Sequence, residues 1–268
     1  MSNPSFEAIL TDVEGTTTSI DFVKNVLFPF SFEHSGNFIQ KLVVEKREPE
    51  HQKILDDLIK TSNEHAKESS EILVIQSKDN SETQISKLTA NVLLWIKQDK
   101  KYTALKNLQG LIWEDGYKSG LIKAHVYPDV PIAFERLNEA GINIHIFSSG
   151  SINAQKLLYS HTEYGNLEKV FFFAFINFNK RSLSLKLISS HFDTTIGPKF
   201  EKESYQRIVE QIGIAPNKIL FLTDIEKEAF AAKAAGLQVR LALRPGNAAL
   251  SESALKEFTT FSSFEEII

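Results

Sequence analysis

The stretch Ala8-Ile9-Leu10-Thr11-Asp12-Val13-Glu14-Gly15-Thr16 decides the fold. Its first four residues, 8–11, form a short apolar run that ends in an acidic turn containing a glycine. An apolar run of this length followed by such a turn is typical of a buried strand that enters a loop. We therefore expect residues 8–11 to be the first strand of a sheet, with Asp12 and Glu14 just beyond its end.

Short apolar runs alternate with helical patterns again in the second half of the chain. The runs that predict strands are 142–147, 219–222 and 237–243, and the patterns that predict helices are 130–140, 205–212 and 226–235, with another helix from Ala154. Such alternation is typical of a parallel sheet covered by helices on both faces. We therefore predict an α/β fold with a doubly wound parallel sheet.

The chain between the first strand and this alternation has a different character. From about Val26 to about Lys123 it is rich in charge and has helical spacing, most clearly at 53–65, 81–99 and 103–113. The sheet must therefore combine the first strand, near the start of the chain, with the strands of the second half. We predict a core formed by residues 1–25 and 124–268, with a helical domain inserted at 26–123.

The structure of residues 170–187 stays open. A phenylalanine-rich run, 171–175, leads into the basic, serine-bearing run 179–182. The segment could form a strand pair, an edge hairpin or a mobile insertion. Because the unbroken apolar run 170–176 would promote aggregation if it were exposed, we expect the phenylalanines to be covered.

The composition excludes several classes of protein. A chain of 268 residues with 42% hydrophobic content can bury a full core. A net charge of −4 without a dense basic run argues against nucleic acid as a partner. The absence of cysteine excludes disulfides and thiolate metal sites. No uncharged run approaches the roughly 18 residues that span a bilayer, and no leader is evident. We expect a cytoplasmic monomer without membrane contact, present also in the nucleus in a eukaryote.

Polar turns follow three of the predicted strands, at 12–16, 148–151 and 223–226. Because the carboxyl ends of parallel strands meet at one edge of a sheet, Asp12 and Asp224 can become neighbours. Two adjacent carboxylates repel each other unless a proton or a cation lies between them. Mg²⁺, a hard cation that prefers oxygen ligands and phosphates, would relieve this repulsion. The sequence therefore predicts a metal site at this edge.

Other polar residues could complete a phosphate site there. Glu14 lies two residues beyond Asp12 and would project to the same side of an extended strand end, so a nucleophile and a proton donor could flank one substrate. Ser148 or Ser149 could donate its hydroxyl to a phosphate oxygen. Ser151 could cap a helix that starts near residue 153, whose free N–H groups favour an anion.

A lysine is needed to balance the remaining charge, and Lys199 lies in a loop before the predicted helix at 205–212, with Lys202 as a rival. Each of these features alone has an ordinary explanation as a turn, a helix cap or a solvated side chain. Chance rarely assembles the ordered series of acid pair, serine, lysine and acid, three of them directly after an apolar strand.

At this point the sequence resembles the haloacid-dehalogenase superfamily and, within it, the enolase-phosphatase (acireductone synthase) family of methionine salvage. The stretches that carry the resemblance are 12–18, 22–24, 27–29, 105–110, 148–151, 154–158, 191–193 and 244–247. The superfamily usually has a second aspartate where Glu14 stands. Glutamate there, followed by Gly15-Thr16, is the most specific mark of the family.

The resemblance implies a role for each candidate residue and a haloacid-dehalogenase-like core with an inserted helical cap. The implied roles are nucleophile and Mg²⁺ ligand for Asp12, metal ligand and acid/base for Glu14, substrate binding for Ser148 and Ser149, phosphate contact for Lys199, and metal ligand for Asp224. Lys199 is preferred to Lys202 because the family's loop reads Ile-Gly-x-Lys, as residues 196–199 do here.

The implied activity is Mg²⁺-dependent conversion of a methylthio diketopentyl phosphate, a small phosphorylated substrate, which is enolised and then dephosphorylated through an aspartyl phosphate on Asp12. A phosphatase of the same superfamily that acts on another small phosphomonoester is the alternative. A binding module has no need of Asp12, Lys199 and Asp224 together, and a dehalogenase needs no metal, so both are disfavoured.

Overall fold

The computed structural model describes residues 5–45, 49–176 and 179–268, and only the backbone of 170–176 and 179–185. The chain divides into two compact units, residues 1–23 with 123–268 and residues 24–122. The first unit is called the core and the second the helical unit below. That the helical unit acts as a cap stays a prediction.

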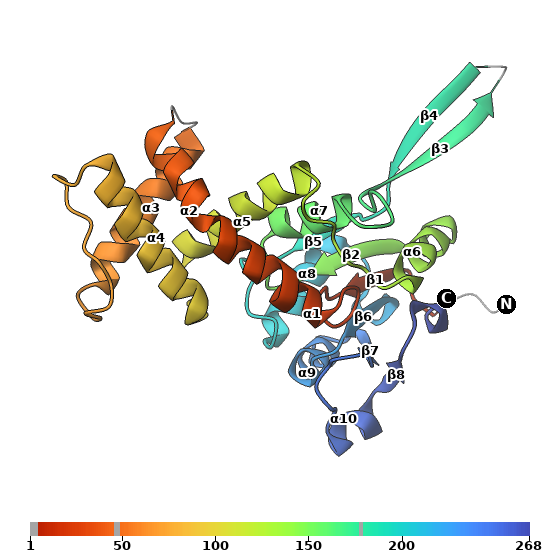
Figure 1. The fold of residues 1–268 in the computed structure, drawn as a ribbon. Coiled ribbons are helices and arrows are strands. Elements are labelled where there is room, and N and C mark those ends of the chain that lie inside the picture. The colour runs from red at the N-terminus through yellow and green to blue at the C-terminus, as the bar shows by residue number, and fades with distance from the viewer. Residues whose placement is uncertain (1–4, 46–48, 177–178) are drawn as a thin grey trace. The chain divides into compact units, whose positions relative to one another are not determined.

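The core contains a six-stranded sheet in the order β5-β2-β1-β6-β7-β8 (Figure 1). All five pairings are parallel, which confirms the predicted fold class. The strands are β1 (Ala8–Thr11), β2 (Asn143–Phe147), β5 (Ser190–Phe192), β6 (Ile219–Thr223), β7 (Gln238–Ala242) and β8 (Thr259–Phe261). The four predicted strands form the centre. The two edge strands, β5 and β8, have three residues each and were not predicted, because so short a run carries no clear periodicity.

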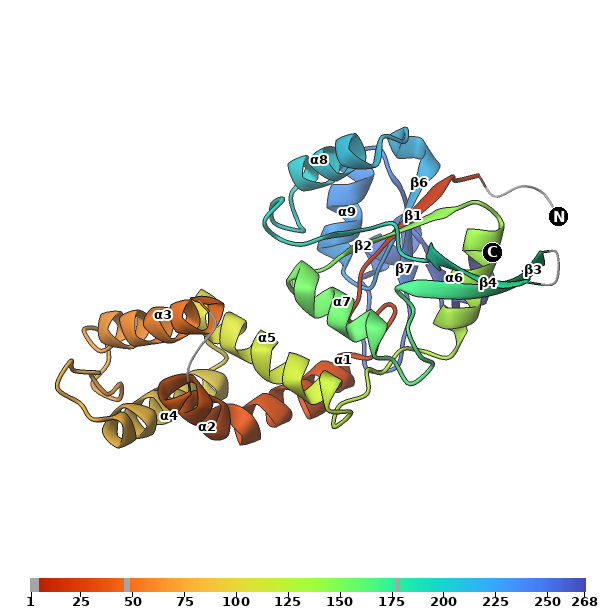
Figure 2. The ribbon, with the colours of Figure 1, turned by 90° about the horizontal axis from the view of Figure 1, so that it is seen from above.

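Helices cover both faces of the sheet, as a doubly wound fold requires (Figure 2). On one face, α8 (Lys202–Ile212) and α9 (Glu226–Ala234) pack on alternate residues of the central strands, such as Leu10 and Phe221. On the other face, α6 (Asp129–Glu139) lies on β2, and its Phe134 contacts Tyr159 of α7 (Ile152–Ser160). The chain ends with α10 (Glu252–Glu257) and a short helix, η3 (Phe264–Glu266).

The segment that the sequence left open forms a separate antiparallel pair, β3 (Lys169–Ile176) and β4 (Asn179–Lys186). Figure 1 shows the two strands as a ribbon of their own, apart from the six-stranded sheet. Of the three alternatives, the strand pair is therefore the one observed. The expectation that the phenylalanines are covered concerns side chains outside the described ones.

The helical unit contains α2 (Phe28–Val44), α3 (Pro49–His65), α4 (Ser81–Lys97) and α5 (Thr103–Lys118). They follow a single turn, α1 (Ile20–Phe22), and a π-helical turn, η1 (Val23–Leu27). Their apolar stripes pack around the fully buried Trp95. In the described part of the chain, no helix is long and apolar enough to span a membrane.

Candidate active site

Three of the predicted residues follow three adjacent strands. β1 lies between β2 and β6, and its Thr11 pairs with Ile146 on one side and Leu222 on the other. Asp12 therefore begins the loop after the central strand, while Ser148 and Asp224 follow its two neighbours. The backbone N–H of Asp12 still donates to the carbonyl of Leu222 at 2.8 Å. The sheet thus brings the strand ends together at one edge, as the sequence predicts.

Asp12 and Lys199 form a buried ion pair at this edge. Lys199 Nζ lies 2.7 Å from Asp12 Oδ1 and 2.8 Å from Glu228 Oε2, and all three side chains are buried. Asp12 Oδ1 also accepts a hydrogen bond of 2.7 Å from the N–H of Val13. The hydroxyl of Tyr205 on α8 donates to the carbonyl of Lys199 at 2.7 Å, which fixes the loop that carries the lysine.

Electrostatics keep Lys199 charged although it is buried. Burial alone would lower the pKa of Lys199, but the carboxylates of Asp12 and Glu228 more than offset this and raise it. Lys202, the rival for this role, is the exposed first residue of α8. The structure therefore brings Lys199, and not Lys202, to Asp12.

Asp224 lies in the same cluster of charges. Burial, followed by the negative charge of Asp12, raises the pKa of Asp224 to about 7, and Glu14 adds to the effect while Lys199 opposes it. Asp224 does not cap α9, whose first free N–H groups begin after Ile225. The ordinary explanation of Asp224 as a helix cap is therefore wrong.

Gly15 allows the loop after β1 to approach Asp224. It has a φ of +71°, and a Cβ there would collide with the carboxylate of Asp224. We predict that Gly15→Ala lowers the free energy of unfolding by about 1 kcal/mol through φ strain, and by more through the collision. Thermal unfolding measures the total.

Gly141→Ala is the matched control for this substitution, because Gly141 has a φ of +74° and open space around it. It should show the φ strain alone. Equal losses of stability in the two variants would mean that the close approach of Gly15 to Asp224 is unimportant.

Glu14 is placed differently from the expectation. β1 ends at Thr11, and Glu14 forms an isolated bridge with Thr18 in a loop closed by a 2.8 Å hydrogen bond from Gly15 N–H to the carbonyl of Thr18. The extended strand that was expected to carry Glu14 is absent because the chain turns immediately. The influence of its carboxylate on Asp224 still places it within electrostatic reach of the cluster.

The serine turn, residues 148–151, lies after β2. Ser148 is buried, and its Oγ accepts a hydrogen bond of 3.2 Å from Gly150 N–H, whereas Ser149 is exposed. Ser151 caps α7 by accepting from Ala154 N–H at 3.2 Å, as predicted.

The predicted anion cradle at the start of α7 needs correction. The N–H of Ile152 donates to Asp193 Oδ2 at 3.1 Å, and that of Ala154 is taken by Ser151. Two of the first three N–H groups therefore have partners within the protein, and the helix start offers an anion fewer free donors than expected.

The residues present fit a divalent cation. The charge of Asp12 acts on both Asp224 and Glu228, and that of Glu14 acts on Asp224. Lys199 is the cation that pairs with two of these carboxylates, Asp12 and Glu228. Oxygen is the donor that Mg²⁺ prefers. In the described part of the chain, no three carboxylate or histidine side chains form a ready-made metal cluster, so two carboxylates with a backbone or amide oxygen would have to suffice. Asn247 Oδ1 is buried beside Gly15 and has no partner.

Comparisons with known proteins give the family. A family model described as haloacid dehalogenase-like hydrolase matches residues 6–236. "Enolase-phosphatase E1" of Caenorhabditis elegans is 43% identical over 98% of this chain and 97% of that protein. The relative of the same name in Xenopus tropicalis is 40% identical over 98% and 95%. The chain belongs to the enolase-phosphatase family of haloacid dehalogenase-like hydrolases. It is therefore an enzyme of the phosphatase class.

Solved structures of similar fold also match this chain. The UTR4 protein of Saccharomyces cerevisiae is 31% identical, with a TM-score of 0.69 over 97% of this chain and 99% of that one. A CbbY variant from Rhodobacter sphaeroides, in complex with xylulose-(1,5)bisphosphate, has a TM-score of 0.52 at 17% identity over 97% of this chain and 96% of that one. The second likeness shows the fold alone.

Two polar residues of the carboxylate cluster were not predicted from the sequence. Glu228 lies in the first turn of α9, four residues beyond Asp224 in the preceding loop, and that closeness in the chain is the signal that could have found it. Burial and the charge of Asp12 raise the pKa of Glu228, against the effect of Lys199. Asn247 donates to the carbonyl of Gly15 at 2.8 Å, and only its place in the family stretch 244–247 pointed to it.

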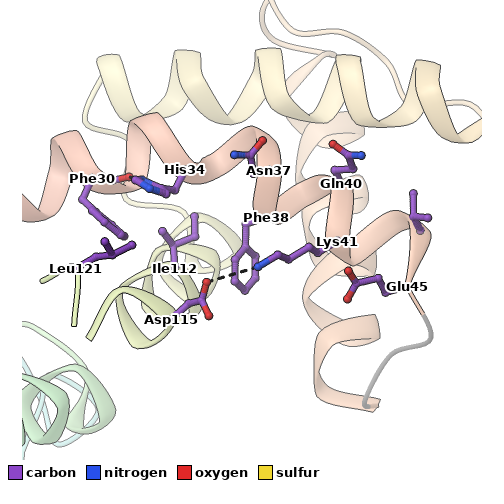
Figure 3. Close-up of a pocket in the computed structure, with 11 residues that line it drawn as sticks. Phe30, His34, Asn37, Phe38, Gln40, Lys41, Glu45, Ile112, Asp115 and Leu121 are labelled. Atoms are coloured by element: carbon purple, nitrogen blue, oxygen red, sulfur yellow. Dashed lines mark hydrogen bonds and ion pairs between the residues drawn. The ribbon is translucent and has the colours of Figure 1, made fainter. Parts of the chain in front are cut away.

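A cavity of about 410 Å³ lies within the helical unit of this chain, between α2 and α5. Figure 3 shows Phe30, Ile112 and Leu121 at one end of it, and Lys41 reaching toward Asp115. None of the residues predicted to bind substrate or metal lines it. The cavity therefore cannot be assigned to the carboxylate cluster.

Proposed function

We propose that the chain is a Mg²⁺-dependent enolase-phosphatase of methionine salvage. It would convert 2,3-diketo-5-methylthiopentyl-1-phosphate into phosphate and the acireductone 1,2-dihydroxy-3-keto-5-methylthiopentene. The observation that carries the proposal is the buried cluster of Asp12, Lys199 and Asp224 after adjacent strands, in a chain that matches relatives named enolase-phosphatase over almost its full length.

Asp12 is assigned as the nucleophile. One of its carboxylate oxygens attacks phosphorus, the bond from phosphorus to the substrate oxygen breaks, and an aspartyl phosphate forms. Water then hydrolyses this intermediate and releases phosphate. Lys199, already held at 2.7 Å from Asp12, is placed to neutralise the charge on the phosphate oxygens. The hydroxyls of Ser148 and Ser149 would bind the phosphate.

Asp12, Asp224 and Glu14 are the residues that would hold Mg²⁺, with Glu14 using its carbonyl or its carboxylate. When bound, the ion would supply charge neutralisation for the phosphate and polarise a substrate carbonyl. The support for this assignment is the burial of Asp224 near the negative charge of Asp12: burial, and then that charge, raises the pKa of Asp224.

Glu14 is assigned as the acid that protonates the departing oxygen, and as a candidate for the base in enolisation. Glu14→Gln keeps the size of the side chain and removes the acid. We predict that turnover falls about 10²–10⁴-fold while the substrate still binds, because general acid/base catalysis contributes about that much.

The two steps measured separately would divide the roles of Glu14. Loss of phosphate release with enolisation intact would confine it to protonation of the leaving group, and loss of both would make it a shared acid/base. Unchanged rates in both steps would remove it from the mechanism. Mg²⁺ affinity should change little in Glu14→Gln if the carbonyl is the ligand, and substantially if the carboxylate is.

The helical unit, residues 24–122, is assigned as the cap that selects the substrate, since the reaction core is shared across the superfamily. The rival function is therefore a phosphatase for another small phosphomonoester. Assaying a panel of phosphomonoesters beside the diketo phosphate, each with Mg²⁺ and with a chelator, separates the two. The proposal requires the diketo phosphate to have the highest kcat/KM and the chelator to stop release. Preference for another ester would favour the rival.

A further inference from the structure

A buried polar chain lies behind the serine turn, and the mechanism above makes no use of it. It consists of Gln155 on α7, His191 on β5 and Glu168, which directly precedes β3. His191 Nδ1 lies 3.0 Å from Gln155 Oε1, and His191 Nε2 lies 2.9 Å from Glu168 Oε1. The side chain of His191 is 1% exposed, so these two oxygens are the groups available to its ring nitrogens.

The contacts of Gln155 fix which way round its amide lies. Its Nε2 donates to the carbonyl of Gly150 at 2.8 Å and to that of Phe192 at 2.9 Å. Carbonyl oxygens only accept, so the NH₂ group must face them, and Oε1 must face His191.

This orientation in turn places a proton on Nδ1 of His191. Nδ1 must carry a hydrogen, because it faces the acceptor Oε1 of Gln155. Nε2 lies beside a carboxylate oxygen of Glu168. Turning the Gln155 amide over would set its oxygen against the carbonyl oxygens of Gly150 and Phe192.

The chain ends at the serine turn. The carbonyl of Phe192, which accepts from Gln155, also accepts from Ser148 N–H at 3.2 Å. Gln155 thus ties the start of the turn, through Phe192, to the carbonyl of Gly150 near its end. Ser148 Oγ accepts from Gly150 N–H at 3.2 Å, and a hydroxyl that accepts there keeps its own proton for another acceptor.

We propose that Gln155, held by His191 and Glu168, is a positioning residue that sets the serine turn so that Ser148 donates its proton to a phosphate oxygen. This inference rests on the proposed role of Ser148 as a phosphate binder. It gives a function to two stretches of the family resemblance, 154–158 and 191–193, that the reaction itself leaves unused.

Gln155→Met tests the proposal, because methionine keeps the length of the side chain and removes both donations. With the diketo phosphate as substrate and inorganic phosphate as inhibitor, KM and the inhibition constant should each rise about tenfold, with kcat within about threefold. The matched control is Gln238→Met. Gln238 Nε2 also donates to two carbonyls, those of Asn217 at 2.8 Å and Ser5 at 3.1 Å, but at the amino end of β7. The control should leave KM unchanged.

Two variants of His191 separate positioning from packing. His191→Asn can present an N–H near the place of Nδ1 and should restore most of the phosphate affinity, whereas His191→Leu should behave as Gln155→Met does. Equal losses in both would overturn the proposal. In the unaltered protein, ¹⁵N NMR should find a proton on His191 Nδ1, and a bare Nδ1 would overturn it even if the variants fail to fold.

Ser148→Ala distinguishes failure of this inference from failure of the proposed function. If Ser148→Ala raises KM and Gln155→Met does not, Gln155 has no positioning role. If Ser148→Ala changes nothing in an active enzyme, the role of Ser148 is wrong and this inference falls with it. An unaltered protein that releases no phosphate from the substrate would overturn the proposed function itself.

Discussion

Asp12→Asn is expected to stop phosphate release, with a fall in rate on the order of 10⁴-fold or more even at saturating Mg²⁺. The amide of asparagine cannot attack phosphorus, although it has the shape of the carboxylate. The fold should survive, because the substitution removes a negative charge that repels Asp224 and leaves Lys199 paired with Glu228. Phosphate release in a single turnover, together with a thermal unfolding curve, measures both effects.

Asp99→Asn is the control for this substitution, since it makes the same chemical change at an exposed residue. Asp99 has a φ of +50°, which asparagine tolerates well, and its ion pair with Lys101 is solvated. It should leave the rate unchanged. Wild-type turnover in Asp12→Asn would show that the nucleophile lies elsewhere.

Lys199→Ala is expected to have the second largest effect, on activity and on stability. It removes the positive charge that lies within 2.8 Å of two buried carboxylates, those of Asp12 and Glu228. Breaking a buried ion pair from one side typically costs about 3–5 kcal/mol of stability. Turnover should fall about 10²–10³-fold, as it does when an electrostatic donor to the transition state is removed.

Lys202→Ala is the comparison, because Lys202 is three residues away and exposed. Its effect on the free energy of unfolding should stay within about 0.5 kcal/mol, and its rate should be that of the unaltered protein. Chemical denaturation and phosphate release measured on both variants decide the matter. The reverse ranking would transfer the phosphate contact to Lys202.

The central strands were predictable because their apolar runs are bounded by polar turns and glycines. β1 and β6 match the expected ranges to within one residue. The edge strands β5 and β8 could not be predicted, since a strand of three residues shows little periodic pattern. The structure of the segment that forms β3 and β4 could not be decided from the sequence for a related reason. An unbroken apolar run has no period that distinguishes a central strand from a hairpin.

The approach of Asp12 to Asp224 was predictable because it depends only on which strands end at the same edge. The position of Glu14 was not, since it depends on where β1 stops and on the turn closed by Gly15 and Thr18. Glu228, four residues after Asp224, could have been found from the sequence. Asn247 reaches the site through loop packing, which adjacent sequence does not encode. The polar chain behind the serine turn was not predictable for the same reason, because its contacts join residues 36 and 23 positions apart.

The most direct test of the account incubates the pure protein with the diketo phosphate and Mg²⁺ and follows acireductone absorbance and free phosphate together. The account predicts that both appear, in equal amounts. With Asp12→Asn neither product should appear, and the reaction should stop at the enolised phosphate, which forms before the attack on phosphorus. Phosphate release without acireductone, or acireductone and phosphate formed equally well by Asp12→Asn, would contradict it.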